Sequence, residues 1–175
     1  MSIKALRKNS LEPFDNLSLI KRYFAAVKSM DQKAVTGKPF EVDAILKLWN
    51  EGGQLFIHGP DPIGERRFKG TRELSRFYAN RARGASGAFS VNLSKINVAN
   101  AKNSEQVLVS GSRYVVNKEK EGMQVPFAHN FRLSSGKIDA LEITVGKAGP
   151  TDIAPIGSLT VKDLGRLAAM AWMVA

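Results

Sequence analysis

The spacing of hydrophobic residues changes near the middle of the chain, and this change restricts what the chain can fold into. In the first half, apolar residues recur at steps of three and four, the spacing of one helix face. From Phe89 onward they alternate with polar residues, the spacing of a strand with one buried face. The sequence therefore predicts a single α+β domain in which helices pack against an antiparallel sheet.

The first half predicts three helices around one short strand. The first helix is capped by Asp15 or Asn16, the second ends at Gly52 and Gly53, and the third is capped by Thr71. The strand spans 54–58, and segment 59–70, rich in turn residues and charges, is expected to form a loop. The inner helix faces are expected to carry Leu17, Ile20, Tyr23, Phe24 and Val27, then Val42, Ile45, Leu46 and Trp49, then Leu74, Phe77 and Tyr78.

The second half predicts a meander of four long strands. In the first of them the alternation changes phase, which places a bulge near Ser94 or Lys95 and would curve the sheet. The second strand covers 105–118, and turns at 119–122 and 134–136 lead into the third strand and into the fourth, 138–145. One face of the third strand carries Met123, Val125, Phe127, His129, Phe131 and Leu133.

Residues 147–175 differ in composition from the meander. They begin with a Gly- and Pro-rich linker that runs to Ser158. An amphipathic helix follows, with Leu164, Leu167, Ala168, Ala171 and Trp172 on one face. The predicted organisation is a domain over 1–146 and a C-terminal arm over 147–175. We expect this arm to cap a pocket of the domain or a dimer partner.

Composition excludes several classes of protein. Apolar residues make up 43% and charged residues 24% of the chain, which is typical of a packed domain and not of disorder. The chain has no cysteine, so disulfides and thiolate metal sites are excluded. The basic N-terminus lacks the apolar stretch of a signal peptide, and no apolar run approaches the roughly 20 residues that span a bilayer. We therefore expect a cytoplasmic protein without a membrane span.

Four stretches carry a resemblance to known proteins. They are LIKRYFAAV, ILKLWNEGGQLFIHG, FKGTRELSRFY and FRLSSGKIDALEI. Together with the order of elements, they resemble the nuclear transport factor 2-like superfamily over about residues 17–146, and most of all its ketosteroid isomerases and SnoaL-like polyketide cyclases. The resemblance implies a cone-shaped, cystatin-like curved sheet packed with three helices around one apolar pocket, and a homodimer formed through the outer sheet face. Members include enzymes and pure binding proteins, so the fold does not name the function.

The resemblance to ketosteroid isomerases singles out three residues. Those enzymes use a tyrosine and a protonated aspartic acid as an oxyanion hole and another aspartate as base. Tyr23 matches the oxyanion tyrosine, His58 the position of the base and His129, within one residue, the position of the oxyanion aspartate. Imidazoles replace both carboxylates here, so the steroid reaction by the same assignment is not expected.

His129 is the strongest single candidate, because it lies between inward-facing phenylalanines, where an imidazole needs a partner. The alternative is a core histidine bonded to a neighbouring group. His58 precedes a Gly-Pro turn, which places it at the pocket mouth or at a solvated strand end. If both imidazoles meet Tyr23, they predict proton transfer on a small, largely apolar carbonyl compound. Two histidines need Asp61 or Glu65 to complete a metal site, so neither metal nor cofactor is predicted.

Further residues are predicted to line the pocket. Glu142 shares the phase of Ile138 and Ala140 and is therefore expected to point into the cone, the alternative being an edge or interface charge. Helical spacing makes Trp49 and its neighbours more typical of a core than of a ligand platform. The predicted lining comprises Phe24, Trp49, Phe56, Phe77, Tyr78, Phe127, Phe131 and Glu142.

Basic residues concentrate in one segment. The net charge is +10, and seven of the 26 cations fall between Arg66 and Arg83. Arg72, Arg76 and Arg83 share one side of the third helix and could bind phosphates, although a solvated face is the preferred interpretation because the aromatic residues there face inward. Three functions remain open: a small-molecule pocket with or without isomerase, cyclase or dehydratase chemistry, a non-catalytic binding or scaffold module, and an anion or nucleic-acid binder.

Overall fold

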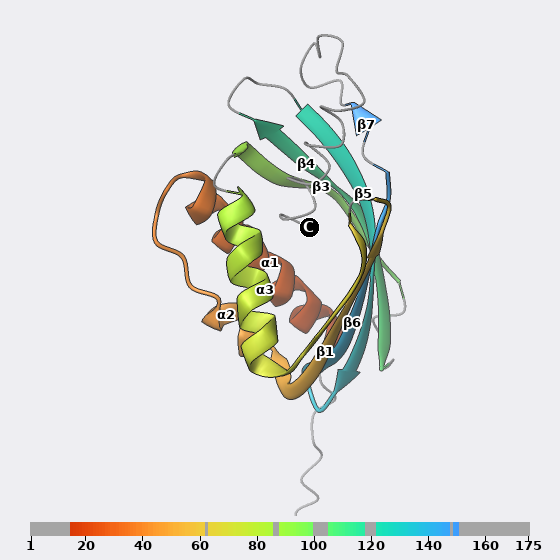
Figure 1. Ribbon diagram of the computed structural model, residues 1–175. Helices are drawn as coiled ribbons and strands as arrows, with labels where there is room; N and C mark the ends of the chain where they lie inside the picture. The colour runs from red at the N-terminus through yellow and green to blue at the C-terminus, as the bar shows by residue number, and fades with distance from the viewer. Residues whose placement is uncertain are drawn as a thin grey trace, which may run out of the picture.

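Two long helices lie across the concave face of one curved sheet (Figure 1). The computed structural model describes residues 15–61, 63–85, 88–99, 105–117, 122–147 and 149–150. Within these ranges the predicted α+β class is confirmed. The predicted C-terminal helix and most of the 119–122 turn lie outside the described residues, so the division into a 1–146 domain and a 147–175 arm stays a prediction.

Helix α1, Asn16–Val35, begins as its sequence predicts and buries every residue predicted for its inner face except Leu17, which is half-buried. The side chain of Asp15 caps it and accepts a hydrogen bond from the backbone N–H of Ser18 at 3.1 Å. Gly37, with φ +68°, ends it in the left-handed conformation that glycine adopts without strain. The buried face consists of Leu19, Ile20, Tyr23, Phe24, Val27, Met30, Asp31 and Ala34.

The predicted second helix is mostly wrong. Helix α2 covers only Asp43–Leu46, and Trp49 starts strand β1, Trp49–Gly59. The apolar residues in this segment are buried, as their spacing suggested: Ile45, Leu48 and Trp49 all lie in the core. The backbone nevertheless leaves the helix, because Trp49 and the residues after Gly53 pair with β6, Lys137–Val145. A short apolar run cannot by itself distinguish the two conformations.

The predicted 59–70 loop contains an edge strand. Strand β2, Gly64–Lys69, pairs antiparallel with β1, and its charged residues are tolerated because an edge strand faces water. Helix α3, Gly70–Ala85, then begins one residue before the expected cap. The Glu73 carboxylate accepts from the Lys69 backbone N–H at 2.7 Å, whereas the Thr71 hydroxyl donates to the Glu51 carbonyl at 3.5 Å, so Thr71 is not the cap.

The remaining strands form the predicted meander. They are β3, Ala88–Ala99, β4, Gln106–Asn117, β5, Gly122–Ser134, and β6, and the sheet order is β2-β1-β6-β5-β4-β3. Neighbours pair antiparallel except β1 and β6, which are parallel. The predicted bulge is confirmed by a register shift between Leu93 and Lys95. Ser135 and Gly136, with φ 52° and 72°, make the tight turn between β5 and β6.

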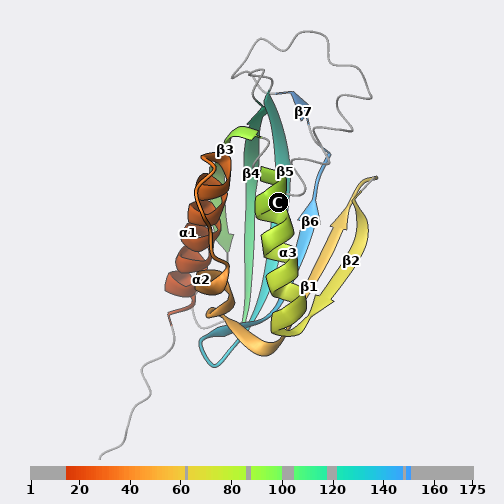
Figure 2. The same cartoon turned by 60° about the vertical axis from the view of Figure 1, so that its left-hand side comes forward.

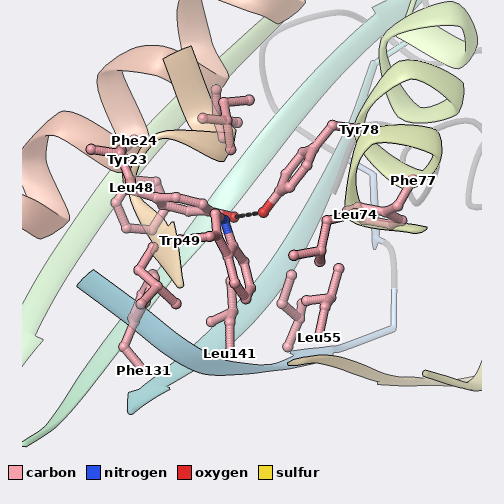
Figure 3. Packing of buried hydrophobic residues seen from close by; sticks show 14 of the residues in the cluster. Tyr23, Phe24, Leu48, Trp49, Leu55, Leu74, Phe77, Tyr78, Phe131 and Leu141 are labelled. Carbon is pink, nitrogen blue, oxygen red and sulfur yellow. Dashed lines mark hydrogen bonds between the residues drawn. The ribbon is translucent and has the colours of Figure 1, made fainter. Parts of the chain in front are cut away.

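The core lies between the concave sheet face and the two long helices (Figures 2 and 3). All six inward positions predicted for β5, from Met123 to Leu133, are buried. Strand β7, Gly149–Pro150, pairs with the start of β5, so the predicted linker begins with a two-residue strand. None of the helices in the described ranges is long and apolar enough to cross a membrane.

Candidate functional site

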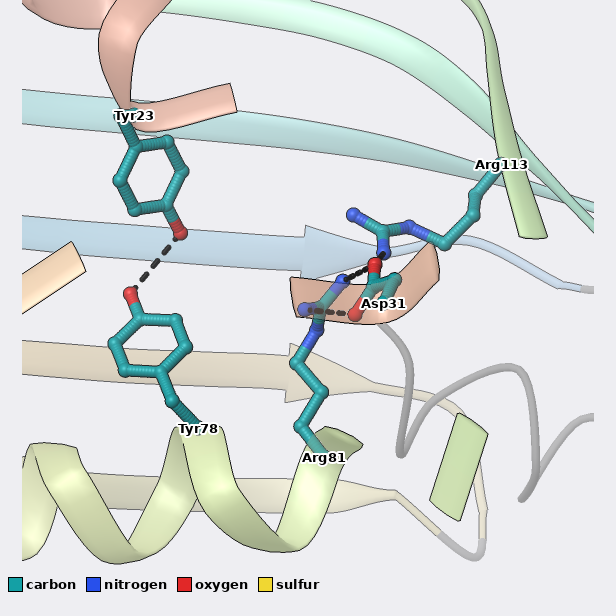
Figure 4. A network of polar contacts seen from close by, with 5 residues as sticks. All are labelled: Tyr23, Asp31, Tyr78, Arg81 and Arg113. Atoms are coloured by element: carbon teal, nitrogen blue, oxygen red, sulfur yellow. Dashed lines mark hydrogen bonds and ion pairs between the residues drawn. The ribbon is translucent and has the colours of Figure 1, made fainter. Parts of the chain in front are cut away.

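Two tyrosines meet in the interior between α1 and α3. The hydroxyl oxygens of Tyr23 and Tyr78 lie 3.1 Å apart, and both residues are buried (Figure 4). Tyr23 points inward because it lies on the apolar face of α1, and Tyr78 because it lies on the inner face of α3. The Tyr23 ring also packs edge-on against Phe24 and Phe131. The ring that carries the Tyr23 hydroxyl is thus packed among other aromatic rings.

Burial determines the protonation state of this pair. Burial raises the pKa of Tyr23 and, more strongly, the pKa of Tyr78, so both phenols are protonated at neutral pH. Their hydroxyls share one hydrogen bond at 3.1 Å, in which either oxygen can be the donor. One of the two hydroxyl protons is therefore left for a further acceptor.

His129 lies beside the tyrosine pair. Its imidazole stacks on Phe24 at 5.3 Å between ring centroids, and its centroid lies 6.4 Å from that of Tyr23. It is 1% exposed, and neither ring nitrogen has a hydrogen-bond partner among the residues that the structure describes. Burial, and then the charges of Arg113 and Arg81, lower its pKa well below the ordinary value, so the imidazole is neutral at pH 7.

A buried charge cluster lies close to the tyrosine pair (Figure 4). It consists of Asp31, Arg81 and Arg113. Arg81 on α3 donates to both carboxylate oxygens of Asp31 on α1, at 2.7 and 2.8 Å. Arg113 on β4 donates to the same carboxylate at 3.2 Å. Burial, followed by the charge of Arg81, lowers the pKa of Arg113 to about 9, so it stays charged at neutral pH. The cluster joins two helices and one strand around a single carboxylate.

The sequence predicted none of these three residues as part of the site, although a signal was present. Asp31 follows Val27 by four residues on the apolar face of α1, and Arg113 keeps the inward phase of Val109 on β4. Arg81 follows Tyr78 by three residues on α3. A charged residue at an inward position of an apolar pattern needs a buried partner of opposite charge. The three positions taken together could therefore have predicted the cluster.

The structure does not bring His58 to Tyr23 and His129. Leu55 and Ile57 are the inward residues of β1, so His58 lies on the opposite, outer face of the sheet. There its Nε2 is 3.1 Å from a carboxylate oxygen of Glu142, and its Nδ1 is 3.6 Å from one of Glu65. The predicted convergence of two imidazoles on the phenol is therefore wrong.

Two predicted lining residues also lie outside. The register of β5 against β6 shifts by one residue at Asp139, which reverses the alternation, so Leu141 and Ile143 are buried and Glu142 is exposed. Phe56 lies on the outer face, with the Arg67 guanidinium 4.7 Å from its ring centroid. The predicted lining residues that are buried in the interior are Phe24, Trp49, Phe77, Tyr78, Phe127 and Phe131.

The basic segment is divided between surface and interior. Arg72 and Arg76, predicted to bind anions, are exposed on α3, as is Arg83. Arg81 from the same segment is in the buried cluster and has no access to a phosphate in solution. Among the residues described, no three His, Asp or Glu side chains are grouped so that they could hold a metal ion.

Comparison with known proteins identifies the fold. No protein-family model matches the chain, and no curated protein matches its sequence. Among solved structures, a nuclear transport factor 2-like protein from Anabaena variabilis is 16% identical, with 87% of this chain and 98% of that chain covered and a TM-score of 0.58. A putative polyketide cyclase from Pseudomonas putida is 17% identical, with 71% and 86% covered and a TM-score of 0.53.

A third structure, of TerC co-crystallised with polyporic acid, is 16% identical, with 74% and 89% covered and a TM-score of 0.53. The protein therefore has the nuclear transport factor 2-like fold, as the four sequence stretches predicted. At these identities the likeness concerns the fold, and the function has to be argued from the interior side chains.

Proposed function

We propose that the protein binds a small, largely apolar molecule in the interior of the fold, with the Tyr23 hydroxyl donating a hydrogen bond to a carbonyl oxygen of that molecule. The observation that carries the proposal is the buried pair of phenols. Two hydroxyl groups bring two protons, and the contact at 3.1 Å uses one of them. The second proton has no partner among the described residues, and leaving a buried donor unsatisfied costs about 1–3 kcal/mol.

The aromatic surroundings support an apolar ligand. Phe24, Phe127 and Phe131 pack around His129 and supply faces on which a flat hydrocarbon frame can stack. The two nitrogens of His129 offer one donor and one acceptor in the neutral imidazole. A ligand with one or two oxygens on an apolar frame would match this combination. TerC, a protein of the same fold, was co-crystallised with a small molecule.

The neutral imidazole favours a second, more specific candidate, proton transfer of the isomerase, cyclase or dehydratase type. His129 would remove a proton from the carbon next to the carbonyl group, and Tyr23 would stabilise the negative charge that develops on the oxygen. The lowered pKa of His129 keeps it unprotonated and able to accept a proton at neutral pH. His58 and Glu142 take no part, because they lie on the outer face.

The test is a matched pair of probes, 2-acetylnaphthalene and 2-ethylnaphthalene, which differ in a carbonyl oxygen. Calorimetry should show the ketone binding about tenfold more tightly, the effect of one satisfied buried donor. Tyr23→Phe should abolish the difference, because it removes the donor and keeps the ring. Tyr78→Phe should weaken the difference only in part, because Tyr23 keeps its proton. Equal binding of the two probes, or no binding of either, would refute the proposal.

A further inference from the structure

We propose that the exposed side of helices α1 and α3 binds double-stranded DNA through its phosphate backbone, without regard to base sequence. This inference goes beyond the proposed function and does not depend on it, because it concerns the surface of the two helices and not the interior. The observation that carries it is the unequal distribution of charge between the helices and the sheet.

The exposed charges of the two helices are almost all positive. Helix α1 exposes Lys21, Arg22, Lys28 and Lys33, and helix α3 exposes Arg72, Arg76 and Arg83. Of the two carboxylates in these helices, that of Asp31 is buried and bonded to arginines. That of Glu73 is exposed and accepts a hydrogen bond from the Lys69 backbone N–H. Both helices therefore present a strong excess of positive charge to the solvent.

The charges on the sheet, by contrast, are partly paired. Arg132 and Asp139 form an ion pair at 2.9 Å, and the His58 Nε2 lies 3.1 Å from a carboxylate oxygen of Glu142. Among the residues that the structure describes, no ion pair involves the helical cations, Lys21, Arg22, Lys28, Lys33, Arg72 and Arg76. Their field is therefore directed to the solvent, where it attracts polyanions.

The helical cations lie on one side of the molecule. The two helices lie side by side over the concave face of the sheet, joined on their buried faces by the Tyr23–Tyr78 hydrogen bond (Figure 2). Their exposed residues therefore lie away from the sheet. Arg72 and Arg76 are one helical turn apart, about 6 Å along the axis of α3. Segment 36–48, which joins α1 to β1, exposes two cations and two carboxylates and leaves the balance unchanged, with Lys38, Glu41, Asp43 and Lys47.

This surface fits duplex DNA better than other polyanions. Helices that bind a membrane surface insert large apolar side chains, and single strands stack their bases on exposed aromatic rings. The aromatic residues of α1 and α3 are all buried: Tyr23, Phe24, Phe77 and Tyr78. The major groove of DNA, about 12 Å wide, accepts a helix between two rows of phosphates, whereas that of duplex RNA is narrow. Phosphate contacts alone supply sequence-independent binding to DNA.

The experiment measures the binding of a fluorescein-labelled DNA duplex to the full chain at pH 7 by fluorescence anisotropy. The association constant should fall about 10²- to 10³-fold between 50 and 200 mM NaCl, because four to six phosphate contacts give a double-logarithmic slope of about −4 to −5. No binding at 50 mM, or a slope weaker than about −2, would overturn the inference.

Other polyanions provide the comparison. A duplex RNA, a single DNA strand and vesicles that contain phosphatidylserine are compared with the DNA duplex at equal concentrations of negative charge. Each should bind more weakly, because each lacks either the wide groove or the paired rows of phosphates. Binding of any of them as tightly as the DNA duplex would overturn the assignment to double-stranded DNA.

Double variants that each remove two positive charges test where the duplex binds. Lys21→Gln with Lys28→Gln on α1, and Arg72→Gln with Arg76→Gln on α3, should each weaken binding at 50 mM NaCl by more than about tenfold and reduce the slope by about 2. These positions are exposed, so the fold should persist.

The matched control is Arg67→Gln with Lys137→Gln, which removes the same charge from exposed positions of β2 and β6. It should change the affinity by no more than about threefold, because only the general field of the protein is reduced. Equal losses in the control and the helix variants would assign binding to the net charge and overturn the inference. An unchanged affinity in either helix variant would overturn it as well.

Discussion

Asp31 and Arg81 form a two-point salt bridge, at 2.7 and 2.8 Å, between the C-terminal halves of α1 and α3, and both side chains are buried. The Tyr23–Tyr78 hydrogen bond joins the same two helices. The helices are thus connected by polar contacts inside a core that consists mostly of apolar residues. Such contacts specify one arrangement of the helices, because a shifted packing would leave charges and hydroxyls buried without partners.

We predict that Asp31→Asn destabilises the protein by about 3–5 kcal/mol, because it leaves the buried guanidiniums of Arg81 and Arg113 without their carboxylate. The free energy of unfolding in urea measures this loss. The matched control is Asp139→Asn, which breaks the partly exposed ion pair with Arg132 and should cost at most about 1 kcal/mol. Equal losses in the two variants would contradict the account of the cluster.

We predict that stability falls as the pH is lowered from 7 to 5, in part through His129. Its folded-state pKa lies well below its unfolded value of about 6.5, so below that pH the unfolded chain binds a proton that the folded chain does not. This single group contributes a slope that approaches about 1.4 kcal/mol per pH unit. His129→Leu should flatten the urea-unfolding profile over this range and should not destabilise the protein at pH 7. Parallel profiles for the unaltered protein and His129→Leu would contradict the lowered pKa of His129.

Gly53 and Gly52 are adjacent in β1 and differ in their surroundings. A Cβ on Gly53 would lie 2.7 Å from the Trp49 ring and 3.0 Å from the Asn50 carbonyl oxygen, whereas one on Gly52 would meet nothing within 4 Å. We predict that Gly53→Ala costs about 1–3 kcal/mol, because Trp49 must shift within a packed core. Gly52→Ala should change stability by no more than about 0.5 kcal/mol. Thermal unfolding of both variants checks the contrast, and similar melting temperatures would count against it.

We predict that His58→Ala and Glu142→Ala leave binding of 2-acetylnaphthalene unchanged within about twofold. Both residues lie on the outer sheet face, with the His58 Nε2 and a Glu142 carboxylate oxygen 3.1 Å apart, opposite the face that carries His129. Calorimetry of these variants beside Tyr23→Phe provides the comparison. A tenfold loss in either outer-face variant would mean that the ligand binds elsewhere.

Much of the fold could be predicted from the sequence, because long elements repeat their burial pattern over many residues. The α1 face around Tyr23 and Phe24 and the β5 face around Phe127 and His129 are both as predicted. The short elements were missed. A four-residue helix before Trp49 and an edge strand with Arg66 and Arg67 carry too few residues for their periodicity to be recognised.

The site was predicted only where the side-chain phase could be followed without interruption. Tyr23 and His129 were placed inside correctly, whereas Glu142 was placed on the wrong face because the phase of Ile138 and Ala140 was continued across the bulge at Asp139. The alternation of Leu141 and Ile143 with polar residues shows the reversed phase. A one-residue shift of register moves every later side chain to the other face of a strand. His58 was misplaced for a related reason, since its face depends on how β1 pairs with β6.

The sequence by itself determined the α+β class, the inward faces of the long elements and the inward position of Tyr23 and His129. Only the tertiary structure decided which polar groups meet. The pairing of Tyr23 with Tyr78, 55 residues apart, and of Asp31 with Arg81, 50 residues apart, depends on how two helices cross over a twisted sheet. Local periodicity determines the direction in which a side chain leaves its own element, and contacts between elements depend on packing across the whole core.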